Sequence, residues 1–434
     1  MRVAIHTLGC KVNQYESQAM EELLQARGHT LVPFDGEADA YLINSCTVTA
    51  VSDKKSRQAV RQVRRRAPEA LIALCGCYPQ VSPEQAAALG ADLVGGTGDR
   101  VAFLDKLEAL ARDQKAGGEV LLDDPFRRMD FEVLPAGGLA GRTRAMLKVE
   151  DGCTNFCTYC IIPYARGRVR SLPLDQAAAE AARLAGEGYR ELVVTGIELS
   201  GYGRDLPGRP SLAQLIQTVC RAAPGLRVRL GSLEPRTVTE DFCRTLADLP
   251  NLCPHFHLSL QSGCDATLAR MGRKYTSADY ARTVDRLNRW FDRPAVTTDL
   301  IVGFPGETEE EFAASLDLVR RCGLARVHVF PYSRRQGTPA AAMPDQVPNA
   351  VKAARAHRAG EALGQLHTTW LAGWVGQRVD VLFEEEKDGW WRGYGPQYME
   401  VRVQGEDLHN RILPVTITGH DDDVLYGQCQ KEEP

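Results

Sequence analysis

Three cysteines close together are the most constraining feature of this chain. They lie in the run Asp151-Gly-Cys-Thr-Asn-Phe-Cys-Thr-Tyr-Cys160, with the spacing Cys-x3-Cys-x2-Cys. Because protein iron–sulfur clusters normally hold each iron through a cysteine thiolate, Cys153, Cys157 and Cys160 can bind three corners of a four-iron cube and leave one iron open. A zinc loop is the alternative, but zinc usually takes four ligands from two paired motifs, and no second such motif occurs here. The spacing therefore favours a cluster.

Bulk composition narrows the class of protein. The chain has 434 residues, 44% of them apolar and 25% charged, which is ordinary for a globular protein of two to four domains. No run of eighteen apolar residues exists and no export signal is apparent, so we expect a cytoplasmic protein without a membrane-spanning segment. Thirteen cysteines in a chain of this size indicate metal binding more than a disulfide framework. With a net charge of −4, any nucleic-acid site must be a local basic patch.

Residues 1–125 alternate strand and helix signals. The predicted strands are Arg2–Thr7, Ala40–Asn44 and Ala70–Leu74, and the predicted helices are Glu16–Arg27, Asp53–Arg66 and Asp99–Arg112. Such alternation predicts an α/β domain with a parallel sheet and helical crossovers. A linker is expected at 126–141, within the looser stretch Lys115–Gly141, which contains Gly117-Gly118 and Gly137-Gly138.

From residue 142 to 370 the alternation resumes and lasts longer. The strand signals are Ala145–Val149, Glu191–Thr195, Arg227–Leu230, His255–Leu260, Val296–Val302 and Arg326–Phe330, with helices such as Leu174–Gly186 and Ser277–Trp290 between them. Six such units are enough for an open, partial β/α barrel, whereas a closed barrel needs eight. Cys153 follows the first strand, which fits the rule that active residues of such barrels lie at the carboxyl ends of strands.

Residues 371–434 show a third pattern. Short strands are expected at Arg378–Glu384, Gly389–Tyr394, Met399–Val403 and Arg411–Gly419, after a helix at Val351–Thr369. No long helix lies among these strands. The pattern predicts a small five-stranded β-barrel related to the OB-fold.

A second set of thiols lies in the N-terminal part. Cys10, Cys46 and Cys77 each follow the end of a predicted strand. In an open parallel sheet, ligands bind in the crevice outside the carboxyl ends of the strands. Three thiols there can hold a second cluster with another open iron. Free cysteine is also a common buried residue, so periodicity alone leaves structural cysteines as an equal alternative.

Several motifs resemble those of the methylthiotransferases, a family of radical S-adenosylmethionine (SAM) enzymes. The Cys153–Cys160 loop resembles the radical SAM signature. The other matching segments are Leu8–Ser17, Asn44–Val48, Gly76–Pro79, Asp151–Arg168, Gly196–Gly203, His257–Gly263, Asp299–Thr308 and Phe330–Pro339. The C-terminal barrel resembles the family's TRAM domain, an RNA-binding module. The resemblance spans the chain and implies that the central part is a radical SAM partial barrel.

The resemblance also implies the cofactors: two [4Fe–4S] clusters and two SAM molecules per turnover. The cluster on Cys153, Cys157 and Cys160 would reduce SAM to methionine and a 5′-deoxyadenosyl radical, which takes hydrogen from the target carbon. Iron–sulfur potentials of about −400 mV and below allow such a reduction. The cluster on Cys10, Cys46 and Cys77 would supply the sulfur, methylated by the second SAM. In the family motif the ligand follows glycine, which selects Cys77 and leaves the extra thiol, Cys75, as an expected bystander.

Residues that contact SAM are expected on the same rim. In this superfamily backbone atoms after a strand bind the SAM amino group, and Thr195, Gly196 and Ile197 align with that place. Glu234 and Gln261 also follow predicted strands and can contact ribose or carboxylate, and the turn from Gly303 to Glu307 can cradle adenine. For each of these segments alone, a turn without a ligand is an equal alternative.

RNA contacts are expected at two basic clusters and one aromatic cluster. Lys54–Arg66 contains seven basic residues, and Arg166, Arg168 and Arg170 follow the Cys153 loop. Phosphate binding by such patches is salt-sensitive and largely independent of sequence, although a solvated helix face is the plainer interpretation. Aromatic side chains of the C-terminal part can stack on unpaired bases, or pack in a core: Trp390, Trp391, Tyr394 and Tyr398.

Three substrates are open within the family. They are tRNA with N6-threonylcarbamoyladenosine next to the anticodon, tRNA with N6-isopentenyladenosine there, and an aspartate of a ribosomal protein. Leu8–Gln14, Ile161–Gly167, Tyr332–Thr338 and Asp345–Val347 look most like the first branch. The expected partners are then the tRNA anticodon stem–loop, a reductant such as flavodoxin or ferredoxin, and a sulfur donor. A non-enzymatic alternative is an RNA-binding iron–sulfur sensor.

Overall fold

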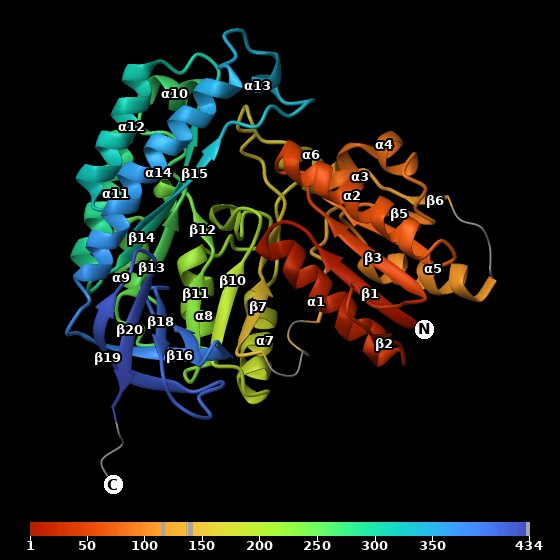
Figure 1. Ribbon diagram of the computed structural model, residues 1–434, viewed down its shortest axis with the longest axis horizontal. Coiled ribbons are helices and arrows are strands. Elements are labelled where there is room, and N and C mark those ends of the chain that lie inside the picture. Colours follow the sequence, from red (N-terminus) through yellow and green to blue (C-terminus); the bar gives the residue numbers. More distant parts are fainter. Residues whose placement is uncertain (114–117, 136, 138–141, 431–434) are drawn as a thin grey trace.

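The computed structural model describes residues 1–113, 118–135, 137 and 142–430 (Figure 1). A parallel N-terminal sheet, a central arc of parallel strands and a C-terminal β-barrel follow one another along the chain. This arrangement confirms the predicted mixed α/β fold class. The domain boundaries near residues 125, 141 and 370 stay a prediction. In the part of the chain that the structure describes, no helix has both the length and the apolar character needed to cross a bilayer.

The N-terminal sheet has six strands in the order β2-β1-β3-β4-β5-β6, all parallel. Its strands are β1 (Arg2–Thr7), β2 (Thr30–Leu31), β3 (Ala40–Ser45), β4 (Leu71–Gly76), β5 (Leu93–Gly95) and β6 (Glu119–Leu121). Its helices are α1 (Lys11–Ala26), α2 (Ala50–Arg66), α3 (Cys77–Val81), α4 (Pro83–Ala87) and α5 (Arg100–Asp113). Successive residues of β3 enter different cores: Leu42 packs with α1 and α5, and Ile43 packs with α2. The sheet is thus covered on both faces, as parallel sheets are.

One prediction for this region differs from the structure. Helix α1 begins at Lys11 instead of Glu16, because Cys10 is its N-cap and the polar residues that follow it form the first turn. Strand β6 pairs with β5 in the first part of the looser stretch, ahead of the linker expected at 126–141. Lys115, Gly117, Gly138 and Gly141 of that stretch lie outside the described residues.

The central part carries seven parallel strands in two sheets, in the orders β11-β10-β7 and β12-β13-β14-β15. The strands are β7 (Arg144–Lys148), β10 (Glu191–Thr195), β11 (Arg227–Leu230), β12 (Ser232–Leu233), β13 (His255–Leu258), β14 (Ala295–Val302) and β15 (Arg326–Pro331). A small antiparallel pair, β8 (Glu150–Asp151) and β9 (Arg170–Ser171), follows β7. Among the strands that the structure describes, β7 and β15 each pair on one side only, so the barrel is open, as predicted.

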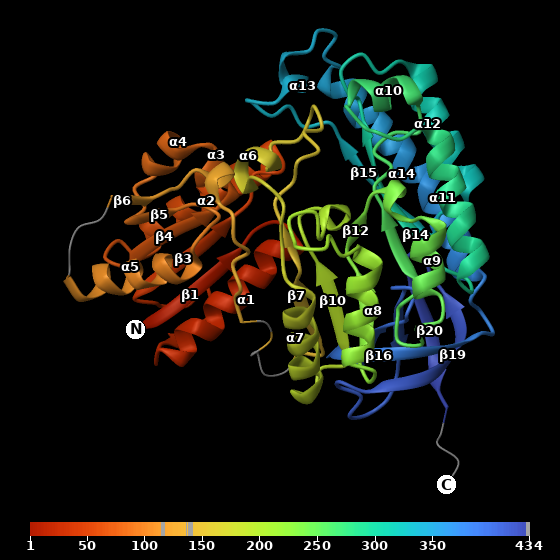
Figure 2. The same ribbon diagram turned by 180° about the vertical axis from the view of Figure 1, so that it is seen from behind.

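The outside of this arc is covered by α7 (Leu174–Gly186), α8 (Leu212–Ala222), α9 (Glu240–Leu246), α11 (Ser277–Trp290), α12 (Glu309–Cys322) and α14 (Asn349–Ala372) (Figure 2). The short helices are α6 (Ile162–Arg166), which packs against α3 of the N-terminal part, α10 (Asp265–Arg270) and α13 (Pro339–Ala342). The 3-10 turns are η1 (Pro125–Arg127), η2 (Leu199–Gly201) and η3 (Pro235–Thr237). Side chains alternate along each strand. Leu192 and Val194 of β10 join the outer core, and Val193 lines a cavity on the inner side. Helix α1 of the N-terminal part lies beside β7 at one edge of the arc.

The C-terminal strands form a closed barrel in the order β16-β17-β18-β20-β19, which confirms the predicted five-stranded barrel. They are β16 (Arg378–Lys387), β17 (Trp390–Tyr394), β18 (Glu400–Val403), β19 (Ile412–His420) and β20 (Val424–Cys429). Closure leaves no unpaired edge. The barrel packs under the amino ends of the central strands: Arg229 of β11 donates to Pro396 O at 2.8 Å.

Candidate active site between two cysteine sets

The N-terminal cysteines follow three neighbouring strands. Cys10 caps α1 after β1, Cys46 follows β3, and Cys77 begins α3 directly after β4. Since β1, β3 and β4 are adjacent and parallel, their carboxyl ends meet at one edge. Burial raises the pKa of the Cys46 thiol, and the nearby Cys77 thiol raises it further. Burial likewise raises the pKa of the Cys77 thiol, and the nearby Cys10 thiol adds to that rise. The structure therefore brings these three cysteines together.

The backbone around these thiols is closely packed. Gly9 has φ +111°, and a Cβ there would lie 2.7 Å from the Cβ of Cys46. Gly76 has φ +101°, and a Cβ there would lie 2.4 Å from Ser45 O. Asn13 Nδ2 ties the turns together by donating to Leu8 O at 2.8 Å and to Ser45 O at 2.9 Å. Only glycine fits at both turns, so the cysteine-bearing segments hold one another in place.

The second cysteine set lies in the loop after β8. Cys153, Cys157 and Cys160 are free thiols. The backbone N–H of Asn155 donates to Cys153 Sγ at 3.5 Å, and Arg273 Nη1 donates to Cys157 Sγ at 3.2 Å. Burial raises the pKa of the Cys160 thiol to about 12. Hydrogen-bond donors aimed at a sulfur stabilise a thiolate that is bound to iron.

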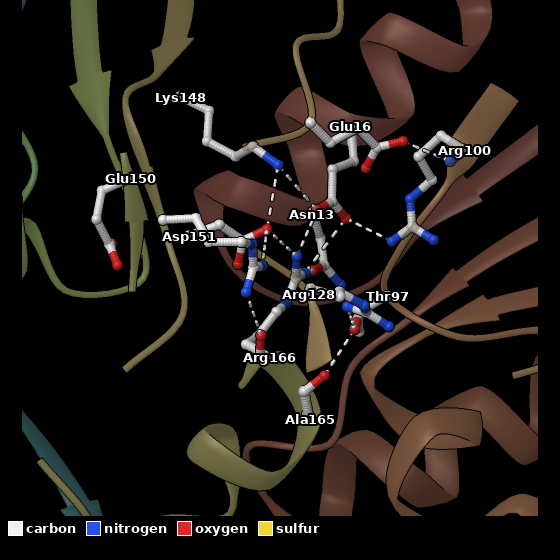
Figure 3. A network of polar contacts seen from close by, with 12 residues as sticks. Asn13, Glu16, Thr97, Arg100, Arg128, Lys148, Glu150, Asp151, Ala165 and Arg166 are labelled. Atoms are coloured by element: carbon white, nitrogen blue, oxygen red, sulfur yellow. Dashed lines mark hydrogen bonds and ion pairs between the residues drawn. The ribbon is translucent and has the colours of Figure 1, made fainter. Parts of the chain in front are cut away.

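A buried ion network connects the two cysteine sets (Figure 3). Arg166, at the end of α6, donates from Nη2 to Asn13 Oδ1 at 2.9 Å and to Glu16 Oε2 at 3.2 Å. Its Nη1 lies 3.4 Å from Asp151 Oδ2, two residues before Cys153. Arg166 also hydrogen-bonds the Cys77 side chain and partly offsets the rise in that thiol's pKa. A single guanidinium thus contacts residues beside both cysteine sets.

Glu16 is the anionic centre of this network. Its side chain is fully buried, and it accepts from Arg100 Nη2 at 2.8 Å and lies 3.6 Å from Lys148 Nζ. Burial opposes its ionisation, but Arg100, Arg166 and Lys148 outweigh that effect and hold the pKa of the carboxyl below its usual range. Cations from α5, α6 and β7 therefore meet on one carboxylate of α1.

A second tie joins the N-terminal and central parts on the side of Cys46. Arg335 donates to Asp53 Oδ2 at 2.6 Å and to Thr47 Oγ1 at 2.6 Å. Ser333 Oγ accepts from the Ala50 backbone N–H at 3.1 Å. Two separate sets of contacts therefore fix the Cys46 segment relative to the barrel.

Part of the predicted SAM-binding set lies around the Cys153 loop. Thr195 ends β10 and accepts from Val149 N at 2.9 Å, and Gly196 and Ile197 follow it. Asn155 Nδ2 donates to Glu198 Oε2 at 3.3 Å and to Glu234 Oε1 at 3.1 Å. The loop that carries the thiols thus contacts two carboxylates, one after the carboxyl end of β10 and one after that of β12.

Gln261 and Gly303 lie farther along the same rim. Gln261 has φ +66° and its backbone bridges to β14, accepting from Ile301 N at 2.9 Å. The N–H of Gly303 donates to Glu307 Oε2 at 2.6 Å, and Glu307 pairs with Arg355 at 2.7 Å. A ligand at Gly303 would therefore have to contact its carbonyl or Cα. The assignment of these residues to SAM stays a prediction.

Comparison with known proteins decides the family. Residues 147–319 match the model of the radical SAM superfamily, and residues 2–96 match "Uncharacterized protein family UPF0004". The chain is 38% identical to threonylcarbamoyladenosine tRNA methylthiotransferase MtaB of Bacillus subtilis (strain 168), over 96% of this chain and 93% of the relative. The chain belongs to the radical SAM methylthiotransferase family.

Two further comparisons place this family member. It is 32% identical to tRNA-2-methylthio-N(6)-dimethylallyladenosine synthase of Pelotomaculum thermopropionicum, over 96% of this chain and 94% of that protein. Its fold is similar to that of the radical SAM methyltransferase TsrM from Kitasatospora setae, with a TM-score of 0.57 and 17% identity over 78% of this chain and 75% of that one. The structural likeness concerns the fold alone.

Radical SAM methylthiotransferases use SAM and a [4Fe–4S] cluster, and the Cys153 loop fits that cluster chemically. It offers three free thiols, two of which accept hydrogen bonds. Among the described residues, no three His, Cys, Asp or Glu side chains converge on a point where one metal ion could bind. A cube differs from a single ion because each thiolate binds a different iron, so its ligands need not converge.

The structure corrects two interpretations of RNA-binding residues. Arg166 and Arg170 are buried with Asp151 and belong to the ion network, so they do not form a phosphate patch. Trp391 lies in the core of the C-terminal barrel. Tyr394 and Tyr398 stack on each other and pack under Arg144 at the contact with the central part, with ring centroids 5.1 Å apart.

Sequence reasoning missed Arg273 and Asn155. Arg273 lies in a loop whose sequence, Gly272-Arg-Lys-Tyr275, carries no metal-binding signal. Arg273 contacts Cys157 only because the fold of the barrel places its loop beside the loop that follows β7 and β8. Asn155 lies within the cysteine run itself, and its side-chain contacts with Glu198 and Glu234 likewise depend on the fold of the barrel.

Proposed function

We propose that this chain is a tRNA methylthiotransferase that converts N6-threonylcarbamoyladenosine, next to the anticodon, to its 2-methylthio derivative. The observation that carries the proposal is 38% identity over nearly the whole length to a relative named for that substrate. Relatives named as dimethylallyladenosine synthases are less similar, at 32% to 35%, against 38% and 39% for two relatives named MtaB. Because one such synthase also covers nearly the whole chain, methylthiolation of N6-isopentenyladenosine is the second candidate.

The proposal assigns the six cysteines to two [4Fe–4S] clusters. Cys153, Cys157 and Cys160 hold one, and Cys10, Cys46 and Cys77 hold the other. When bound, the first cluster and SAM supply the carbon radical that takes hydrogen from the substrate, and the second cluster supplies the sulfur. The assignment is supported by the meeting of the three N-terminal cysteines at one sheet edge, with Cys46 and Cys77 buried, and by the Arg166 network beside both sets.

In this proposal the protein's own residues bind SAM and hold the two cysteine sets in place. Thr195, Gly196, Ile197, Glu234, Gln261 and Gly303 hold SAM on the rim of the barrel. Asn155 fixes the loop against Glu198 and Glu234, and Arg273 donates to Cys157 Sγ, which stabilises a bound thiolate. Arg166 and Glu16 keep the two cysteine sets in one orientation, because a shift of either would leave a buried charge unpaired.

An RNA-binding face is proposed next to these loops. Phe126, Phe156 and Tyr164 form an aromatic cluster, with Phe156 and Tyr164 43% and 40% exposed. Phe156 lies within the Cys153–Cys160 run, so a base stacked there would lie beside the proposed radical source. Five cations of α2 are not taken up by its contacts with Asp92 and Phe34 and can meet phosphates: Lys54, Lys55, Arg57, Arg61 and Arg65. Turnover also needs a reductant such as flavodoxin or ferredoxin, and a sulfur donor.

Two experiments test the proposal. Incubating the reduced, cluster-loaded protein with SAM should yield 5′-deoxyadenosine, and its absence would contradict an enzymatic role and favour an RNA-binding iron–sulfur sensor. Nucleoside mass spectrometry of tRNA from a deletion strain should show loss of 2-methylthio-N6-threonylcarbamoyladenosine. Loss of the 2-methylthio-isopentenyl nucleoside instead would support the second candidate, and loss of neither would direct attention to a ribosomal-protein aspartate.

A further inference from the structure

A cavity of about 480 Å³ lies where the three parts of the chain meet. Helix α1 contributes Lys11 and Gln14, the inner faces of β7 and β10 contribute Met146 and Val193, and the C-terminal barrel contributes Tyr398. The volume is within the range of small-molecule sites. Its lining is mostly polar or charged, and Met146 and Val193 are its apolar walls. None of the predicted SAM-binding residues lines this cavity.

Some of the charged side chains that line the cavity have ion-pair partners, and others do not. Arg229 pairs with Glu191 through two contacts of 2.7 and 2.8 Å, and Arg144 donates to Glu384 Oε2 at 2.9 Å. The remaining carboxylate, Glu385, accepts from Arg392 at 2.8 Å.

Two lining cations have no such partner. Within the described residues, Lys11 and Arg142 form no ion pair. Lys11 is half-buried and Arg142 is exposed at the rim. An ammonium held in a partly closed cavity without an ion pair favours an anionic ligand group. The cavity therefore suits a ligand that carries an anionic group.

The position of Lys11 ties this cavity to the reaction. Lys11 directly follows Cys10, and both lie at the N-terminus of α1 beside β7. In adenine, C2 and C6 flank the same ring nitrogen, N1, so a substituent on N6 extends along the edge that carries C2. A base whose C2 reaches the sulfur beside Cys10 would therefore direct its N6 substituent toward the neighbouring residues of α1.

We propose that this cavity receives the N6 substituent of the substrate nucleoside and that Lys11 binds its carboxylate. The inference rests on the proposed function, because it takes threonylcarbamoyladenosine as the substrate. The threonylcarbamoyl group ends in a carboxylate and a hydroxyl, whereas the isopentenyl group is a hydrocarbon. Lys11 is then a specificity residue: an isopentenyl group would leave the ammonium unpaired in the cavity, which selects against it.

Binding of anticodon stem–loops to the cluster-loaded, full-length protein tests this inference without turnover. Fluorescence anisotropy would compare stem–loops with the threonylcarbamoyl group, its carboxylate methyl ester, or the isopentenyl group. The unaltered protein should bind the free acid about tenfold more tightly than the ester, as expected for one charged hydrogen bond. Lys11→Met should remove that difference, and Lys11→Arg should keep most of it.

A matched control separates this role from general RNA binding. Lys54 is also a lysine in the first turns of an N-terminal helix, but it is exposed on α2. Lys54→Met should weaken binding of all three stem–loops by the same factor, because a phosphate contact does not depend on the modification.

The outcomes are distinguishable. If Lys11→Met keeps the full preference for the acid, or if the unaltered protein does not distinguish acid from ester, the inference is wrong although the proposed function stands. If the unaltered protein prefers the isopentenyl stem–loop, the proposed function itself fails. The ester comparison needs no variant, so it decides the question even if Lys11→Met does not fold.

Discussion

Arg166 donates to Glu16 across the boundary between the two cysteine-bearing parts of the chain, with Nη2 3.2 Å from Oε2. Glu16 lies two turns into the helix that begins after Cys10, and Arg166 ends the short helix that follows Cys160. Both side chains are fully buried. Such a pair adds little net stability when intact, but loss of one partner is costly because the other charge stays buried. The pair therefore restricts the chain to one relative placement of the two cysteine sets.

Glu16→Gln should destabilise the N-terminal part by about 3 kcal/mol or more, because three cations lose their common carboxylate. Native-state hydrogen exchange of the α1 amides measures this change. Since the folded state lowers the pKa of Glu16, its ionised form stabilises the fold above the ordinary carboxyl pKa, and this contribution is lost as pH falls through the lowered pKa.

The difference between Glu16→Gln and the unaltered protein should thus be largest at neutral pH and begin to shrink below about pH 4.3. Glu21→Gln is the control, because Glu21 lies on the same helix outside the network, and it should change stability by no more than about 0.5 kcal/mol. Equal effects of the two substitutions would show that the network does not hold α1 in place.

Cys77→Ala should abolish methylthiolation while 5′-deoxyadenosine formation continues, because the thiols of the Cys153 loop remain. Cys75→Ala should leave both products at the level of the unaltered protein. Cys75 belongs to β4, and its side chain is fully buried in the core between the sheet and helices α1 and α5. Quantifying both products by mass spectrometry checks this pair, and inactivation by Cys75→Ala would reverse the ligand assignment.

Arg273→Met should slow reductive cleavage of SAM by about tenfold, the cost typical of losing a residue that supports a metal ligand. Loss of the donor to Cys157 Sγ should also make the cluster potential more negative, because hydrogen bonds to sulfur raise it. A redox titration followed by electron paramagnetic resonance measures the potential. Arg282→Met, on the exposed face of α11, is the control and should change neither quantity. An unchanged potential in Arg273→Met would mean that this contact does not tune the cluster.

Phe156→Ala and Tyr164→Ala should each weaken stem–loop binding by about 1 kcal/mol or more, roughly fivefold, if bases stack on them. Anisotropy at fixed salt concentration measures the affinity. Met129→Ala removes an exposed side chain of a different kind and should have no such effect. Unchanged affinity in both aromatic variants would place the stacking surface elsewhere, for instance at Trp390 and Tyr426 of the C-terminal barrel.

The fold could be predicted from the sequence where periodicity is long and regular. Leu174–Gly186 and Ser277–Trp290 form the expected helices with the same bounds, and the short C-terminal strands predict the five-stranded barrel, which the structure shows to be closed. The start of α1 could not be predicted, because Lys11–Tyr15 mixes polar and apolar residues whose burial depends on contacts with Asn44 and Arg166. Strands β5 and β6 have only three residues each, too few to show the alternation of side chains that predicts a strand.

The sequence spacing and the family resemblance predict that the candidate site residues lie together. They do not predict which charged side chains lie beside them. In the sequence Arg166 is one of three closely spaced arginines, a pattern that favours an exposed basic cluster. Only the fold shows that Arg166 is buried against Glu16 and Asp151. Arg273 and Lys11 likewise carry no distinguishing signal in the sequence. The fold places Arg273 beside Cys157, and it places Lys11 in the cavity where the three parts of the chain meet. Contacts between residues this far apart in the chain carry no local signal.

The most direct test of the central claim is a turnover measurement with two matched anticodon stem–loops. The cluster-loaded protein, SAM and a reductant would be incubated with RNA that carries N6-threonylcarbamoyladenosine or N6-isopentenyladenosine, and the nucleosides would be analysed by mass spectrometry. We predict a 2-methylthio product from the threonylcarbamoyl RNA that requires both Cys77 and Cys153. A 2-methylthio product from the isopentenyl RNA alone, or a product that forms without Cys77, would contradict the account.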